Sequence, residues 1–136
     1  MPKNSDLYNL ALKCRENAYA PYSKFKVGAA ILSKNNLIFG GCNVENASYP
    51  CGTCAEAGAI SAMISGGENE IKEILIVADT ASILPCGNCL QKIAEFADEK
   101  TLVHSADISG NIKTYFLKEL LPQNFSAKDI KDGTSA

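Results

Sequence analysis

Cysteines at the starts of two predicted helices constrain this chain more than any other feature of its sequence. Cys86 and Cys89, in the string PCGNC, have the C-x-x-C spacing that places both sulfurs on one side of a helix's first turn. Cys54 stands two residues before Glu56 at another helix start, in the string TCAEA. Zinc prefers thiolate ligands, so these three cysteines are candidate ligands of one Zn²⁺ ion.

A C-x-x-C pair alone also fits a redox dithiol or a structural zinc module. The third cysteine and the glutamate are more specific, because zinc deaminases combine a cysteine or histidine ligand, a non-ligating glutamate and a later P-C-x-x-C. Three thiolates leave one position of a four-coordinate Zn²⁺ open to water, whose pKa the metal lowers. Glu56 would pass the proton of that water to a ring nitrogen and to the departing amine, provided that its pocket raises its pKa. These parts predict hydrolytic deamination.

The other cysteines allow an alternative. Cys51 and Cys54 form a second C-x-x-C pair, so four thiolates could instead build a closed structural zinc site. Such modules stabilise small domains without a core, whereas 46% of this chain is hydrophobic. We therefore interpret Cys51 as a residue of a pocket wall, Cys14 and Cys42 as core residues, and His104, the only histidine, as structural.

Length and charge narrow the class of protein. The 136 residues fit one domain, 1–136, in which 126–136 is a loose tail. The formal net charge is -2 and the lysines are scattered, so no basic face favours nucleic acid. No apolar run approaches the roughly 20 residues that span a bilayer, and residues 1–10 lack the apolar core of a secretory signal. We expect a cytoplasmic protein without a membrane partner, whose cysteines are thiols or metal ligands rather than disulfides.

Hydrophobic periodicity predicts an alternation of helices and strands. A first helix begins at Ser5 as its N-cap and is stopped by Pro21, and the apolar runs 25–33 and 37–44 form a hairpin around a turn at 34–36. The remaining predicted elements are a helix at 55–64, a strand at 71–78, a helix at 86–97, strands at 101–105 and 112–116, and a short helix at 116–121. This order implies a mixed sheet with helices on its faces, so the fold class is α/β.

Several strings, in this order, resemble the small zinc-dependent cytidine deaminases that act on free nucleosides. They are YAPYS at 19–23, FKVGAA at 25–30, NVENASY at 43–49, CAE at 54–56, PCGNC at 85–89 with Gln91, and LLP at 120–122 followed by Phe125. The resemblance implies a three-layer α/β/α sandwich around a five-stranded mixed sheet and one Zn²⁺ per subunit. It also implies deamination of cytidine and 2'-deoxycytidine in pyrimidine salvage.

The same resemblance assigns roles in substrate binding. It implies that Asn43 and Glu45 hydrogen-bond the ribose hydroxyls, that Phe25 packs against the nucleoside, and that Ala55 belongs to the substrate site. An amide and a carboxylate match sugar hydroxyls, and an aromatic face suits a pyrimidine. The family's homotetramers imply that Phe125 reaches the site of a neighbouring subunit.

The chain departs from the family pattern beside the proposed ligands. Ala57 and Leu90 stand where the family usually has arginines. Zinc with three thiolates carries a net negative charge, which a nearby cation would balance. We expect backbone N–H groups at the two helix N-termini, or another side chain, to compensate. The nearest rival function is deamination of another cytosine nucleoside, such as a nucleoside antibiotic, whereas residues 43–46 favour plain nucleosides.

Overall fold

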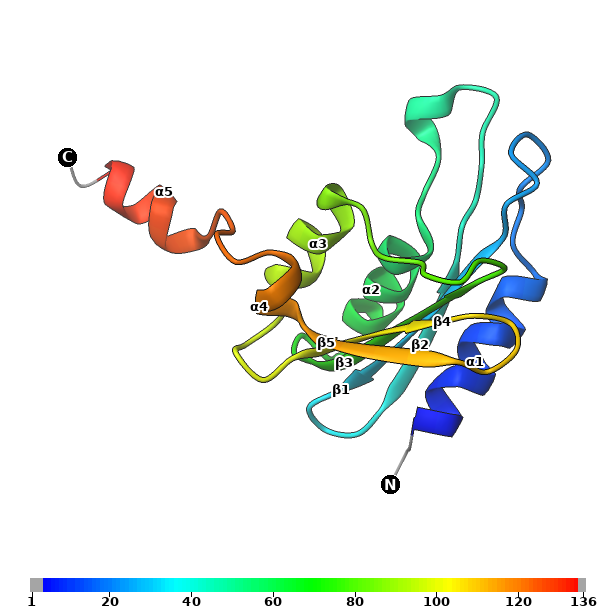
Figure 1. Ribbon diagram of the computed structural model, residues 1–136. Coiled ribbons are helices and arrows are strands. Elements are labelled where there is room, and N and C mark those ends of the chain that lie inside the picture. Colours follow the sequence, from blue (N-terminus) through cyan, green and yellow to red (C-terminus); the bar gives the residue numbers. More distant parts are fainter. Residues whose placement is uncertain (1–3, 135–136) are drawn as a thin grey trace.

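A computed structural model describes residues 4–134 and contains one five-stranded sheet (Figure 1). The strands are β1 Val27–Ser33, β2 Ile38–Cys42, β3 Ile71–Ala78, β4 Leu102–Ala106 and β5 Ile112–Phe116. Their order in space is β2-β1-β3-β4-β5, with β3 and β4 parallel and the other neighbours antiparallel. The sheet is therefore mixed, as predicted.

Helices cover both faces of this sheet, which makes a three-layer sandwich (Figure 1). Helix α1 Asn4–Glu16 packs on one face through the buried Leu7 and Ala11. Helices α2 Ala55–Ser65 and α3 Gly87–Ala94 lie on the other face, where Met63 and Ile93 are fully buried. The predicted α/β/α arrangement is confirmed.

Strand β3 is apolar because helices cover it on both faces of the sheet. Its residues from Ile74 to Ala78 are all buried, with Ile74 and Ile76 in the core under α2 and α3 and Leu75 and Val77 in the core under α1. Alternate side chains of a strand point to opposite faces, so a strand covered on both faces must be apolar at every position.

The first helix is shorter than predicted. Helix α1 ends at Glu16, and Ser5 lies inside it rather than at its N-cap. Tyr19 instead pairs with the chain beyond β2: its backbone N–H donates to the carbonyl of Asn43, and its carbonyl accepts from the N–H of Glu45. These bonds to a distant segment replace helical ones. The residue before Pro21 is moreover disfavoured from helical geometry.

The end of the chain also differs from the sequence interpretation. A short helix, α4 Leu117–Leu120, follows β5, and a further helix, α5 Ala127–Thr134, occupies most of the predicted loose tail at 126–136. Helix α5 extends away from the sheet (Figure 1). The N–H of Ser126 donates to the Asp129 carboxylate at 2.8 Å, a local cap that hydrophobic periodicity does not reveal.

His104 is a buried structural residue in β4. One ring nitrogen, Nε2, lies 2.7 Å from Oε1 of Glu73 in β3, and the other, Nδ1, lies 2.7 Å from Oγ1 of Thr114 in β5. Both ring nitrogens are therefore satisfied by neighbouring strands, which agrees with the structural interpretation. None of the helices at 4–134 is long and apolar enough to cross a membrane.

Candidate metal centre

The three predicted ligand cysteines converge at the adjoining starts of α2 and α3. Cys54 is the N-cap of α2, Cys86 is the N-cap of α3, and Cys89 lies in the first turn of α3. Their sulfur atoms all lie within 4.8 Å of one another. Tetrahedral zinc with Zn–S bonds of about 2.3 Å separates its sulfurs by about 3.8 Å, so a small inward movement of the side chains suffices. The donor set fits Zn²⁺.

The environments of the α3 thiols differ in a way that favours a bound cation. The pKa of Cys86 is lowered chiefly because the backbone N–H of Cys89 donates to its sulfur, and the N–H of Asn88 adds to this. The pKa of Cys89 is raised because the thiol is buried and lies beside Glu56 and Cys54. A helix N-terminus therefore stabilises one thiolate, while the buried one needs a positive ion.

Glu56 lies in the first turn of α2 and is only 5% exposed. Burial raises the pKa of its carboxyl, and its own backbone N–H, the Cys89 thiol and Lys92 offset part of that rise. A carboxyl with a raised pKa exchanges protons more readily near neutral pH than an ordinary surface glutamate. The predicted acid–base residue is thus next to the candidate metal ligands.

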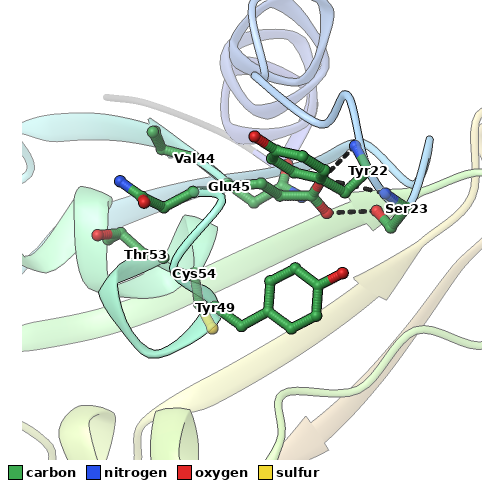
Figure 2. A pocket seen from close by; sticks show the side chains of 10 residues that line it. Tyr22, Ser23, Val44, Glu45, Tyr49, Thr53 and Cys54 are labelled. Atoms are coloured by element: carbon green, nitrogen blue, oxygen red, sulfur yellow. Dashed lines mark hydrogen bonds between the residues drawn. The ribbon is translucent and has the colours of Figure 1, made fainter.

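A cavity of about 530 Å³ opens beside Cys54 (Figure 2). It is lined by Tyr22, Ser23, Asn43, Val44, Glu45, Asn46, Tyr49, Gly52, Thr53 and Cys54. Pockets that hold small ligands commonly measure about 300–1,000 Å³, so a nucleoside-sized molecule fits here.

Cys51 does not have the position that the sequence interpretation gave it. It lies in the short 3-10 turn Tyr49–Cys51, and its sulfur is 3.5 Å from the Ser48 hydroxyl. Among the described residues it belongs neither to the group of converging cysteines nor to the residues that line the cavity. The pocket-wall interpretation of Cys51 is therefore wrong. The closed four-cysteine site also lacks its fourth ligand.

Asn43 directly follows β2, and its amide group is held by the chain at the start of β1. Its Nδ2 donates to the carbonyl of Phe25 at 2.8 Å, and its Oδ1 accepts from the N–H of Val27 at 2.9 Å. One amide proton and one lone pair of Oδ1 remain for another partner. The side chain is thus fixed in orientation at the cavity wall.

Glu45 is held by the turn that follows Pro21. Its Oε1 accepts from the backbone N–H groups of Tyr22 at 3.0 Å and Ser23 at 3.1 Å, and its Oε2 accepts from the Ser23 hydroxyl (Figure 2). The pKa of Glu45 is lowered, chiefly by the bond from the Ser23 hydroxyl. Glu45 is therefore an ionised, oriented acceptor in the cavity.

Two aromatic residues of the cavity were missed by the sequence interpretation. The rings of Tyr22 and Tyr49 lie 6.2 Å apart with an interplanar angle of 63°, an edge-to-face pair between two loops. Both residues lie within the strings of the family resemblance, but a tyrosine in a loop gives no local sign of a ring partner in another loop.

The remaining candidates lie outside the lining of this cavity. Phe25 is partly exposed, Ala55 is buried at the start of α2, and Phe125 is 60% exposed. The carbonyl of Phe125 accepts from Nε2 of Gln91 at 2.8 Å, which ties the C-terminal segment to α3. Among the described residues, Phe125 is not one of those that line this cavity.

Comparisons with known proteins agree with this geometry. The family model described as the cytidine and deoxycytidylate deaminase zinc-binding region matches residues 1–105. The cytidine deaminase of Halalkalibacterium halodurans is 42% identical over 123 residues, which cover 90% of this chain and 93% of that protein. The cytidine deaminase of Sporosarcina psychrophila is 43% identical over 119 residues, which cover 87% and 88%.

Solved structures extend the similarity to the fold. The crystal structure of cytidine deaminase from Burkholderia pseudomallei superimposes with a TM-score of 0.85 at 38% identity, covering 92% of this chain and 100% of that one. The enzyme from Mycobacterium tuberculosis superimposes with a TM-score of 0.78 at 31% identity, covering 92% and 98%. With three thiols and a buried glutamate at the family's zinc-binding region, this chain belongs to the cytidine and deoxycytidylate deaminase family.

Proposed function

We propose that this protein hydrolyses cytidine and 2'-deoxycytidine to uridine and 2'-deoxyuridine with release of ammonia. The observation that carries the proposal is the buried Glu56 among three converging thiols, beside a cavity of nucleoside size. The relatives that bear the name cytidine deaminase match nearly the whole chain, which supports the same reaction.

Each step of the reaction has a residue suited to it. Cys54, Cys86 and Cys89 would hold Zn²⁺, and the bound ion would supply the Lewis acidity that makes water a nucleophile near neutral pH. Glu56 accepts a proton from the attacking water and delivers it to the ring nitrogen next to the carbon under attack. It then transfers the second proton to the amino group, whose bond to that carbon breaks as ammonia leaves.

Substrate binding is assigned on chemical grounds. Glu45 is ionised and can accept a hydrogen bond from a sugar hydroxyl, while the free proton and lone pair of Asn43 can bond another. Phe25 is proposed to pack against the base and Ala55 to line the site near the metal.

Assembly and location belong to the same proposal. The exposed Phe125 suits a homotetramer in which this ring enters a neighbouring subunit's site. Light scattering on the purified protein tests this assembly, and a monomer would contradict it. A cytoplasmic location and a single domain over 1–136 stay predictions of the sequence, which fractionation of cells and limited proteolysis can test.

The decisive experiment follows ammonia release and zinc content together. The purified protein is expected to deaminate both nucleosides, and Glu56→Gln to keep its zinc while losing about 100- to 10,000-fold in kcat, as expected for loss of a general acid–base. Glu99→Gln, at an exposed position between α3 and β4, is the matched control and should retain activity. Full zinc occupancy without turnover of either nucleoside would contradict the proposal.

A further inference from the structure

The Ser23 hydroxyl connects two residues that are proposed to bind the substrate. It donates to Oε2 of Glu45 and accepts from the backbone N–H of Phe25 at 3.0 Å. A serine hydroxyl has a single proton, and a carboxylate can only accept, so the direction of both bonds is fixed. Figure 2 shows the Ser23 side chain directed at the Glu45 carboxylate on the cavity wall.

This contact determines where the carboxylate points. Two backbone N–H groups hold Oε1 of Glu45, and the Ser23 hydroxyl holds Oε2, so both oxygens are restrained from the same turn. Each oxygen can accept more than one hydrogen bond, so the carboxylate can still receive a ligand hydroxyl. A side chain that is ordered before binding avoids the entropy cost of ordering it in the complex.

The backbone beside Ser23 shows that the turn is held in an uncommon conformation. Lys24, between Ser23 and Phe25, has a φ of 61°, in the left-handed region that few residues other than glycine adopt. Its N–H donates to the carbonyl of Ala20 at 3.0 Å. Such a conformation persists where neighbouring contacts enforce it, and the two bonds of the Ser23 hydroxyl are contacts of this kind.

We propose that Ser23 is a positioning residue for nucleoside recognition. Its hydroxyl holds the Glu45 carboxylate in the orientation in which it can accept hydrogen bonds from the sugar hydroxyls. The inference rests on the proposed function. Under it, the preference for a sugar with hydroxyl groups depends on Ser23, although Ser23 acts through Glu45 and need not touch the substrate.

The test is Ser23→Ala, assayed with cytidine and with 2',3'-dideoxycytidine, whose sugar lacks both ring hydroxyls. The KM for cytidine is expected to rise about tenfold with kcat and zinc content nearly unchanged, since a hydrogen bond to a charged group is lost. The KM for the dideoxy compound is expected to stay within about twofold of the original protein's. Ser109→Ala, in the exposed turn between β4 and β5, is the control and should leave both KM values unchanged.

A second pair of variants keeps the proposal testable if Ser23→Ala fails to fold. Thr and Val have nearly the same shape and differ in the hydroxyl, so Ser23→Thr is expected to keep a low KM for cytidine and Ser23→Val to raise it. Equal KM values for these two variants would overturn the proposal. So would an equal rise in KM for both nucleosides in Ser23→Ala, or a loss of zinc, because each indicates a merely structural role.

Failure of this inference is distinguishable from failure of the proposed function. If the unsubstituted, zinc-loaded protein does not deaminate cytidine, the proposed function fails. If it does, and the effect of Ser23→Ala does not depend on the sugar hydroxyls, only the role of Ser23 fails.

Discussion

Substitution of Gly41 by alanine tests how the fold positions the metal centre. Gly41 lies in the edge strand β2 under helix α2, where a Cβ atom would come within 2.3 Å of the Ala59 nitrogen and 2.6 Å of the Ala55 oxygen. Both are backbone atoms of α2, so no side chain can rotate away to make room. Either α2 or β2 must move.

The size of that movement follows from the contact distances. Non-bonded heavy atoms settle about 3.5 Å apart, so the elements must separate by about 1 Å. Overpacking of this kind costs about 1–3 kcal/mol of unfolding free energy. Because α2 carries Cys54 and Glu56 while α3 carries the other two ligands, a shift of about 1 Å between them should lower kcat by about 100-fold.

Gly58→Ala, within helix α2, provides the matched control. The nearest atoms to a Cβ at Gly58 lie 3.6 Å away, which is ordinary contact. Alanine in a helix interior is favoured over glycine by about 0.5–1 kcal/mol, so this variant should unfold at a slightly higher temperature and keep full activity. Cytidine turnover, zinc content and thermal unfolding are measured on both variants. A Gly41→Ala protein with unchanged kcat and unfolding temperature would refute the reasoning.

Three further predictions concern single side chains. Cys51→Ala should retain zinc and Cys54→Ala should lose it, as measured by metal analysis after dialysis. Loss of zinc from both variants would instead support the closed four-cysteine site. After zinc removal, iodoacetamide at about pH 7 should label Cys86 well before Cys14, because a backbone N–H lowers the pKa of the first thiol and burial raises that of the second. Peptide mass mapping checks this, and equal labelling would contradict it. His104→Ala should lower the unfolding free energy by about 2–4 kcal/mol in denaturant titrations, because it leaves a cavity and two unpaired polar neighbours, and an unchanged midpoint would refute this.

Much of the fold was predictable from local sequence. The strands at 71–78 and 112–116 and the helix from residue 55 appear where periodicity and β-branched runs predict them. The metal ligands were predictable for another reason: thiolate spacing and the glutamate beside Cys54 have few other chemical uses. Local sequence is sufficient to predict a feature that lies within a single helix, strand or motif.

The cavity wall was not predictable in this way. Glu45 and Ser23 are separated by 22 positions, and their hydrogen bonds exist because two loops meet in space. The same meeting ends α1 early, since Tyr19 bonds to the chain beyond β2 instead of extending the helix. Periodicity reports which face of an element is buried, and it contains no information on which loops will meet.

The charge of the metal centre can be balanced without the arginines that this chain lacks. Cys54 and Cys86 are both N-caps, so each sulfur stands at the positive end of a helix, and the N–H groups near Cys86 already lower the pKa of that thiol. Lys92, one turn beyond Cys89, adds a side-chain cation that stabilises the ionised form of Glu56. Because the backbone supplies part of the compensation, Ala57 is compatible with a working site. This compensation depends on α2 lying close against the sheet, so that Cys54 stands beside the ligands from α3. Gly41 permits that close approach, because it has no Cβ atom to meet the backbone of α2.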